Sequence, residues 1–216
     1  MNNNPKIELL STILISIAVV CSAWCAFQAS IWNGLQAFRL SDANNMRRKV
    51  QIAQLDYNQQ LTLDVAIFIH YLNAKFNQQE DAAEFYQKRF RDEFRPAFET
   101  WMKQDPFHNP EAPLGPFRLP EYVDQYQKPI QETELKAQNL MERAHEANTV
   151  SDSYILLTVF FALVLFFGAI SARTKGKFTG SIFLGMALVI FVVSLFLLSR
   201  YPVSLKSGAF ILERLT

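Results

Sequence analysis

Three apolar segments without a charged residue dominate the hydrophobic pattern of the chain. They cover about residues 9–31, residues 154–172 and about residues 181–198. A helix of about 20 apolar residues is long enough to cross the hydrocarbon core of a bilayer. The pattern therefore predicts three transmembrane helices. A short hairpin at residues 173–180, with Gly176 and Gly180 supplying the turn, is expected between the second and third.

A cleaved signal peptide is the competing interpretation of the first segment. Its amino-terminal side carries only Lys6, offset by Glu8. The apolar run is longer than the roughly 7–15 residues typical of a signal peptide. Val20 and Trp24 precede the two cysteines, which does not fit a lipoprotein cleavage site. We therefore expect an uncleaved anchor.

Helical spacing continues beyond the first segment. No proline lies between Lys6 and Arg95, and apolar residues recur at alternating steps of three and four. These positions are Met46, Val50, Ala53, Tyr57, Leu61, Val65, Phe68 and Leu72. The pattern predicts one helix that leaves the membrane and ends at about Phe76.

A second seam with the same spacing runs into the second apolar segment. Its members are Thr133, Ala137, Leu140, Ala144, Ala147, Ser151 and Tyr154. The seam predicts a second long helix, antiparallel to the first. Pro129 is expected in or near the first turn of its main segment, where the missing N–H of proline is tolerated.

Residues 77–120 join these two long helices. After a break at residues 77–81 we expect one helix, which Pro96 ends or kinks near Phe94. Its aromatic residues are interpreted as core rather than as a cofactor site, and they are Phe85, Phe90, Phe94, Phe98 and Trp101. Residues 105–120 hold five of the nine prolines and are predicted to be extended.

The proline-rich segment has two interpretations. It is either a strap packed across the helix ends or a loop that docks a partner, because long loops on rigid scaffolds often carry function. The candidate contact residues are Phe107, His108, Phe117 and Leu119.

These elements together predict an all-α integral membrane protein. Two of its three transmembrane helices extend into a long antiparallel stalk, with a helical cap and a proline-rich strap. The expected domains are residues 1–32 (tail and first span), 33–153 (extramembrane helical domain), 154–200 (hairpin of two spans) and 201–216 (carboxy-terminal tail).

Two rows of small residues mark the first span as a helix-packing surface, since small side chains let helices approach closely in lipid. One row is Ala18, Ser22, Ala26 and Ser30, and the other is Cys21, Cys25 and Ala29. Both are expected to meet another span or a second copy of the chain. Gln28, the one strongly polar side chain in a span, is expected to form an interhelical hydrogen bond; a pore lining is the alternative.

The positive charges predict an orientation. Short loops rich in Lys and Arg mark the cytoplasmic side, whereas long domains cross a membrane largely regardless of charge. Lys6, Arg173, Lys175 and Lys177 therefore place the amino terminus and the 173–180 hairpin in the cytoplasm, and residues 33–153 outside it. Basic residues after the first and third spans favour the opposite arrangement, namely Arg39, Arg47, Arg48, Lys49, Arg200 and Lys206.

Several motifs resemble a family of uncharacterised bacterial inner-membrane proteins. Ser22-Ala-Trp24 and Phe27-Gln-Ala-Ser-Ile-Trp32 are similar to its "TAWSGYQASRW" signature. Similarity extends to the segments 94–101, 105–113, 116–122 and 151–154, and so to most of the chain. Cys25 stands where the pattern has Gly or Ser. The family has no assigned activity, so the resemblance implies a three-span architecture and a bacterial inner membrane, and nothing about chemistry.

No catalytic pattern stands out in the sequence. It has no glycine-rich phosphate loop and no nucleophile elbow, and His145-Glu146 lacks the second histidine of a zinc protease. A net charge of +1 argues against a nucleic-acid binder, and spans without ionisable residues argue against a proton-coupled transporter. His70 is expected to be a core histidine, and Asp64 to lie on a solvated face or in a salt bridge. We expect no cofactor, no metal and no enzymatic activity.

The sequence thus favours a non-enzymatic scaffold or subunit of a membrane assembly. Its expected partners are the lipid bilayer and either further copies of itself or another membrane protein. Two alternatives remain, an oligomeric channel lined by the first helix and a ligand-sensing bundle that signals through a partner.

Overall fold

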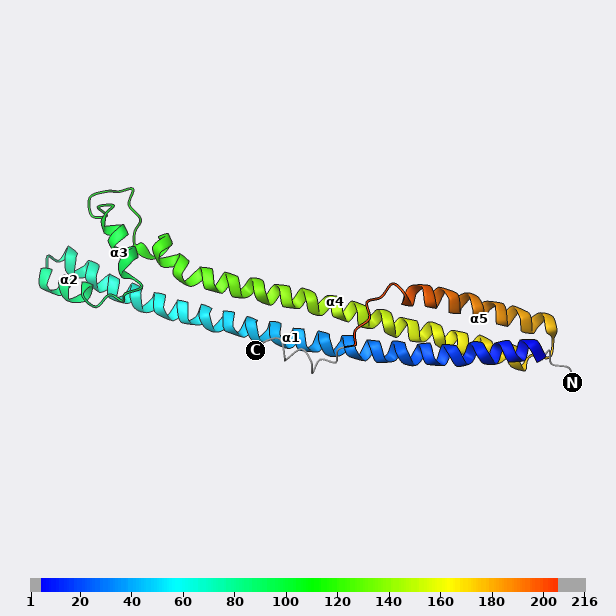
Figure 1. Cartoon of the computed structure of the whole chain (residues 1–216). Coiled ribbons are helices and arrows are strands. Elements are labelled where there is room, and N and C mark those ends of the chain that lie inside the picture. The colour runs from blue at the N-terminus through cyan, green and yellow to red at the C-terminus, as the bar shows by residue number, and fades with distance from the viewer. Residues whose placement is uncertain (1–4, 206–216) are drawn as a thin grey trace. The chain divides into compact units, whose positions relative to one another are not determined.

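The computed structural model describes residues 5–205, and this part of the chain is helical without a strand. The order is α1 (Pro5–Phe76), α2 (Glu80–Gln87), α3 (Arg95–Met102), the 3-10 helix η1 (Pro116–Arg118), α4 (Pro120–Arg173) and α5 (Lys177–Leu198), as Figure 1 shows. The predicted all-α class is confirmed. So is the prediction that α1 continues from its apolar half to Phe76. Residues 206–216 of the expected carboxy-terminal tail lie outside the described residues.

Three helices, α1, α4 and α5, are long and apolar enough to cross a membrane. This agrees with the three predicted spans and with a multi-pass membrane protein. The chain separates into two compact units, to each of which α1 and α4 contribute. Unit 1 is Met1–Ser41 with Leu140–Thr216, and unit 2 is Asp42–Asn139.

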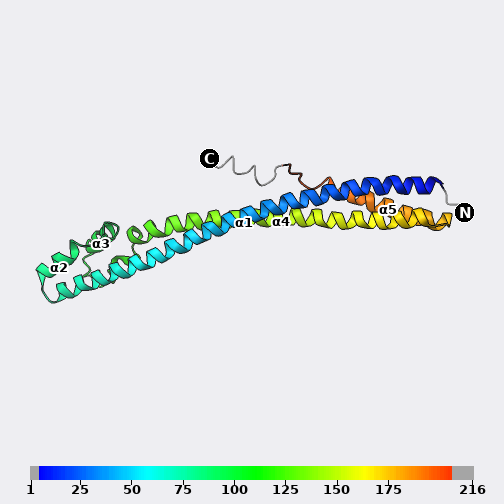
Figure 2. The same ribbon diagram turned by 90° about the horizontal axis from the view of Figure 1, so that it is seen from below.

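In unit 1, α1 and α4 pack antiparallel, and three hydrogen bonds join them. Ser11 Oγ donates to Ser171 Oγ at 3.2 Å, and Ser151 Oγ donates to the Ala29 carbonyl at 3.0 Å. Arg39 Nη1 donates to the Arg143 carbonyl at 2.9 Å. From one pair to the next, the α1 residue number rises while the α4 number falls, as antiparallel helices require. The two helices of this unit run side by side in Figures 1 and 2.

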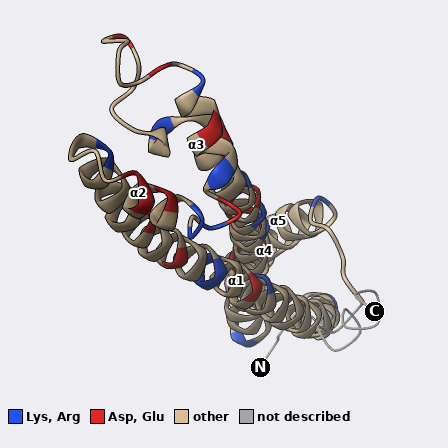
Figure 3. Ribbon diagram, turned by 90° about the vertical axis from the view of Figure 1, so that its left-hand side faces the viewer, with Lys and Arg blue, Asp and Glu red and all other residues tan. Residues whose placement is uncertain are grey.

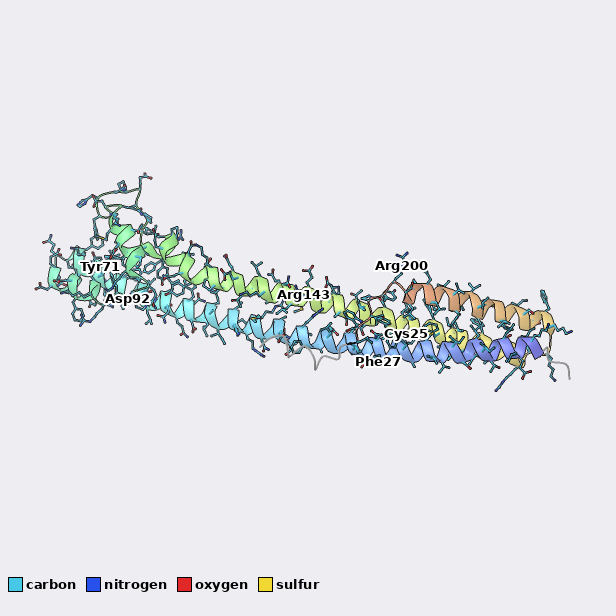
Figure 4. The ribbon with its side chains drawn as sticks, viewed as in Figure 1. Cys25, Phe27, Tyr71, Asp92, Arg143 and Arg200 are labelled. Atoms are coloured by element: carbon cyan, nitrogen blue, oxygen red, sulfur yellow. The ribbon has the colours of Figure 1, made fainter. Side chains whose placement is uncertain are left out.

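Most buried residues of α1 in unit 1 lie at spacings of three, four or seven, namely Ser11, Leu14, Ala18, Cys25 and Gln28. Such spacing keeps one helix face against a neighbour and is typical of left-handed packing near 20°. Ala29 and Ile31 are buried as well. Figure 4 labels Cys25, which belongs to this seam, and Phe27, which is half exposed.

The two predicted rows of small residues do not lie on this seam as units. Ala18 is buried, Ser22 is half-buried, and Ala26 and Ser30 are exposed. Each i, i+4 step turns about 40° around an α-helix, so such a row drifts away from a seam that averages 3.5 residues. Ala26 and Ser30 therefore do not meet another span of this chain. Their contact with a second copy stays a prediction.

The second row matches the seam better. Cys25 and Ala29 are buried and Cys21 is half-buried. Both cysteines are free thiols.

Helix α5 buries only a narrow stripe, formed by Gly180, Ala187 and Ser194. Ser171 Oγ donates to the Gly180 carbonyl at 2.8 Å, which joins the start of α5 to the end of α4. Only residues 174–176 separate these helices. Gly176 precedes α5 as its N-cap, but Gly180 lies inside the helix, so the expected role of Gly180 in the turn is wrong.

The core of unit 2 is aromatic. Phe90, Phe94, Phe98 and Trp101 are buried, as predicted, whereas Phe85 is half exposed. They are joined in one cluster by Phe68, Tyr71 and Tyr122 from α1 and α4. T-shaped ring pairs are frequent in it, for example Tyr71 with Phe98 at 5.2 Å between ring centroids.

Three local predictions in this unit are wrong. The single helix expected to carry Phe85 to Trp101 is instead two helices, α2 and α3, separated by turns at residues 88–94. Pro96 sits in the first turn of α3, where its missing N–H costs no helical hydrogen bond, so it begins a helix instead of ending one. Similarly, α4 begins at Pro120, which places Pro129 inside the helix. Figure 3 shows the acidic and basic residues of α2 and α3 on the ribbon.

His70 is exposed and does not belong to the core. Its ring stacks on Tyr86, with centroids 5.5 Å apart and an interplanar angle of 19°. In the apolar run 65–72, Ile69 is 49% exposed, Phe68 and Tyr71 are buried in the core, and Ile67 and Leu72 are partly buried against it.

Candidate functional site: a buried Asp64–Arg91–Tyr122 cluster and the loop beside it

A charged cluster lies in the core of unit 2. Asp64 on α1 is 2% exposed. Arg91 Nε donates to its Oδ1 at 2.9 Å, and Arg91 Nη2 donates to its Oδ2 at 2.8 Å. The Tyr122 hydroxyl donates to the same Oδ2 at 2.9 Å, and Arg91 Nη2 also donates to the Tyr126 hydroxyl at 2.7 Å. We call these four residues the Asp64 cluster.

The electrostatics of the cluster favour its charged arginine and its neutral tyrosine. Hydrogen bonding to the Asp64 carboxylate raises the pKa of Arg91. Burial raises the pKa of Tyr122, and its donated hydrogen bond to Asp64 raises it further. A buried carboxylate is tolerated where charge-assisted hydrogen bonds replace its hydration. Two nitrogen atoms of Arg91 and one hydroxyl supply those bonds here.

The cluster fixes three segments to one another. Asp64 belongs to α1, Arg91 to the turns between α2 and α3, and Tyr122 and Tyr126 to the first turns of α4. Among the described residues, no buried side-chain nitrogen or oxygen lacks a hydrogen-bond partner. A fully satisfied buried network of this kind holds a unique arrangement of segments.

The proline-rich segment 105–120, which we call the proline loop, is attached to the same core. The Phe117 ring stacks on Phe94 at 5.2 Å with an interplanar angle of 10°, and it meets Phe68 edge-on at 5.4 Å. Trp101 Nε1 donates to the Pro113 carbonyl at 2.6 Å. Phe107 packs edge-on against Trp101 at 5.9 Å. The loop is therefore held at both ends and in its middle.

The four predicted contact residues of the loop divide into two groups. Phe107, Phe117 and Leu119 are partly buried and pack against the aromatic core. His108 is exposed, and its Nδ1 lies 2.9 Å from Asp105 Oδ1. Three of the four residues thus pack against the core, and the strap stays a prediction. The segment is not extended as predicted, because it consists mainly of turns, bends and η1.

Leu114 is the large apolar residue that the loop presents outward, and the sequence pattern did not single it out. Its side chain is 99% exposed. It stands beside a surface hollow of about 390 Å³, lined by Phe68, Pro113, Leu114, Gly115, Phe117 and Arg118. The available signal was the placement of Leu114-Gly115 between Pro113 and Pro116. Two prolines restrict the backbone on both sides of such a pair, which is typical of an ordered loop tip.

A second polar contact lies in unit 1. Gln28 is fully buried, and its amide is bonded to the backbone of Ser204 and not to another helix. Trp32 Nε1 and the Tyr154 hydroxyl both donate to the Pro202 carbonyl, each at 3.2 Å. Gln28 therefore holds the segment after α5. Gln28 does not line a pore in this structure, because other parts of the same chain cover its side chain.

The structure also revises the interpretation of Asp64. Of the two expectations for Asp64, the solvated face is wrong because the residue is buried. The salt bridge is present, with Arg91. Arg91 lies in the turns between α2 and α3, and no sequence pattern indicated this pairing. The usable signal was the spacing, because Asp64 falls between Leu61 and Phe68 on the buried side of α1.

In the part of the chain that the structure describes, no group of three His, Cys, Asp or Glu side chains is placed to hold a metal ion. Comparison of the chain with protein-family models, with curated proteins and with solved structures gave no match.

Proposed function

We propose that the protein is a non-enzymatic, multi-pass membrane protein that acts as a scaffold or subunit of a membrane assembly, and that its proline loop binds a partner protein. One observation carries this proposal: the loop is anchored to the aromatic core, yet it presents Leu114 fully to solvent. An isolated exposed leucine is ordinary on a protein surface. Here it belongs to a loop that is anchored to the core, and it lines a hollow whose side chains are apolar apart from Arg118.

The energetics favour binding at this point. Burying a leucine side chain contributes about 1.5–3 kcal/mol. A loop that is already ordered loses little conformational freedom when it binds, so more of this energy remains as affinity. The Trp101–Pro113 hydrogen bond and the Phe117–Phe94 stack supply that order.

The orientation and the membrane belong to the same proposal. Lys6, Arg173, Lys175 and Lys177 lie at one end of the spans along the sequence, and we place them in the cytoplasm. The proline loop is then outside the cytoplasm. The resemblance to bacterial inner-membrane proteins supports a bacterial inner membrane as the location, with α1 and α4 as stalk and α2 and α3 as cap.

A photo-crosslinking amino acid at position 114 tests the partner. The variant is produced in its native membranes, irradiated, and compared with a variant that carries the same group at Glu132, an exposed position on α4. We expect a discrete protein adduct from position 114 and none at the same mass from position 132. The adduct partner should co-purify with the wild type and with Leu135→Asp, but not with Leu114→Asp. Identical adducts from both positions, or equal co-purification with Leu114→Asp, would contradict the proposal.

A further inference from the structure

The outer face of α1 in unit 2 exposes a row of large apolar side chains. Ile52 is 60% exposed, Leu55 57%, Leu63 56% and Ile69 49%. The buried side of the same helix segment points elsewhere and carries Asp64, Phe68 and Tyr71. This part of α1 therefore has two apolar faces, of which the chain covers one.

The exposed row has the spacing of a coiled-coil seam. Steps of three and four connect Ile52, Leu55, Gln59, Thr62, Ala66 and Ile69, all of which are exposed. Leu63 flanks this line. Alternating steps of three and four keep side chains on one face when two helices wind around each other at 3.5 residues per turn. We call this line the outer seam.

Charge distinguishes the outer seam from an ordinary solvated face. Between Val50 and Ala74 the only Asp, Glu, Lys or Arg residues are Asp56 and the buried Asp64. The part of α4 in the same unit, Pro120–Asn139, carries six charged residues. Solvent-exposed faces of helices are usually rich in charged and polar side chains. An uncharged face with exposed Ile and Leu is typical of a surface that another protein covers.

The seam suits a second copy of the same chain in parallel orientation. Two copies inserted alike in one membrane present α1 in the same direction, and confinement to the membrane raises their effective concentration. In a parallel, in-register pair, identical seam residues meet, and none of them is charged. The flanking Asp56 of one copy then lies across from Gln51 of the other, so no like-charge contact arises between residues 52 and 69 of the pair.

We propose that the protein self-associates through the outer seam of α1, as a parallel pair of helices in unit 2. This surface is separate from the proline loop and goes beyond the partner proposed for that loop. The two can fail independently, since self-association needs only the purified chain and loop binding needs a different protein.

Disulfide crosslinking in membranes tests the seam. Single cysteines replace Ile52, Leu55, Gln59, Thr62, Ala66 or Ile69 in the full chain, in which Cys21→Ala and Cys25→Ala remove the native thiols. Gln54→Cys on α1 and Lys136→Cys on α4, both exposed and off the seam, are the matched controls. Under mild oxidation we expect covalent dimers at the seam positions, several times more abundant than at the controls.

A charge variant gives an independent measurement. Leu55→Lys with Ile69→Lys places two cations on the outer seam without changing a buried residue. The control is Leu135→Lys on α4, because Leu135 is 65% exposed in the wild type. By light scattering of solubilised protein we expect a two-chain particle for the wild type and for Leu135→Lys. The double variant should give a one-chain particle with unchanged helical circular dichroism.

Three results would overturn the proposal. The first is a wild-type particle of one chain together with seam cysteines that crosslink no more than Gln54→Cys and Lys136→Cys. The second is a two-chain particle that Leu55→Lys with Ile69→Lys leaves intact. The third is crosslinking of the seam cysteines to a different protein, which would assign the face to that protein.

Discussion

Gln28 and Ser204 exchange two hydrogen bonds. Gln28 Nε2 donates to the Ser204 carbonyl at 3.0 Å, and the Ser204 N–H donates to Gln28 Oε1 at 3.0 Å. The segment 201–205 is not helical, so its backbone groups need partners outside regular secondary structure. A primary amide has a donor and an acceptor side by side and therefore matches one residue's backbone in both directions. Gln28 fixes the chain after α5 to α1 in this way.

Replacement of Gln28 by leucine should release that segment. The variant loses two neutral hydrogen bonds, each with a net contribution of about 0.5–1.5 kcal/mol, and leaves the Ser204 backbone unpaired. Ser204→Cys retains the backbone and reports the change, because the thiol should react faster with a maleimide when Gln28→Leu is also present. The measurement uses full-length protein without Cys21 and Cys25.

Asn33→Leu is the matched control for this experiment. Asn33 is an exposed amide on the same helix, outside the contact with Ser204. Its replacement should leave the labelling rate at position 204 unchanged. Equal acceleration by both substitutions, or none by Gln28→Leu, would mean that Gln28 does not hold the segment.

Ala18 and Ala26 should respond differently to enlargement, although both belong to one predicted row. Ala18 is fully buried in unit 1 and Ala26 is exposed. Leucine at position 18 must displace packed neighbours, at a cost of about 1–3 kcal/mol. Leucine at position 26 meets no such neighbour within the chain, and surface substitutions usually change stability by less than about 0.5 kcal/mol. Thermal unfolding in detergent, followed by near-ultraviolet circular dichroism, measures the difference. Equal losses for the two variants would show that the seam is misplaced.

The long elements were predictable because they depend on periodicity alone. A three-four pattern without proline specifies a helix to Phe76 whatever that helix packs on, and an uncharged run of sufficient length specifies a helix that could cross a membrane. The packing face was less accessible. The row that begins with Ala18 consists of small residues at a plausible spacing, but only the neighbouring helix decides which residues of α1 it covers.

The site itself depends on long-range pairing, which a single sequence does not display. Arg91 lies among several charges of both signs at residues 88–95, and nothing local distinguishes it from Arg89 or Arg95. Arg89 instead lies over the Phe85 ring, with its Cζ 3.5 Å from the ring centroid. The turns that divide α2 from α3 aim Arg91 inward, and those turns were not foreseen.

Removal of one partner of the Asp64–Arg91 pair should be more harmful than removal of both. Asp64→Asn leaves the half-buried Arg91 guanidinium with only the longer contact to the exposed Glu93 carboxylate, at 3.5 Å, and breaking a buried pair typically costs about 3–5 kcal/mol. In the double variant Asp64→Leu with Arg91→Met, apolar side chains replace both charges, and we expect a smaller loss. Unfolding midpoints of the wild type, Asp64→Leu, Arg91→Met and the double variant measure the coupling. A double variant that loses the sum of the two single losses would contradict the pairing.

Alkaline pH should weaken the folded state through Tyr122. Burial, together with the hydrogen bond to Asp64, raises the pKa of its hydroxyl in the folded protein above that of an unfolded tyrosine, which is about 10. Above that pH the unfolded chain releases this proton while the folded chain retains it. The stabilisation is therefore complete below about pH 10 and decreases above it, by up to about 1.4 kcal/mol per pH unit for one proton. Burial raises the pKa of Tyr71 as well, so this residue adds a decrease of the same sign.

Tyr122→Phe separates the two contributions. The variant should be less stable than the wild type near neutral pH, because Asp64 loses a donor in a buried site. Its stability should then decrease less steeply between pH 9 and 11, since one tyrosine with a raised pKa has been removed and Tyr71 remains. Unfolding midpoints across this range measure both effects. If the wild type and Tyr122→Phe lose stability with the same slope above about pH 10, the Tyr122 proton is not held by the fold.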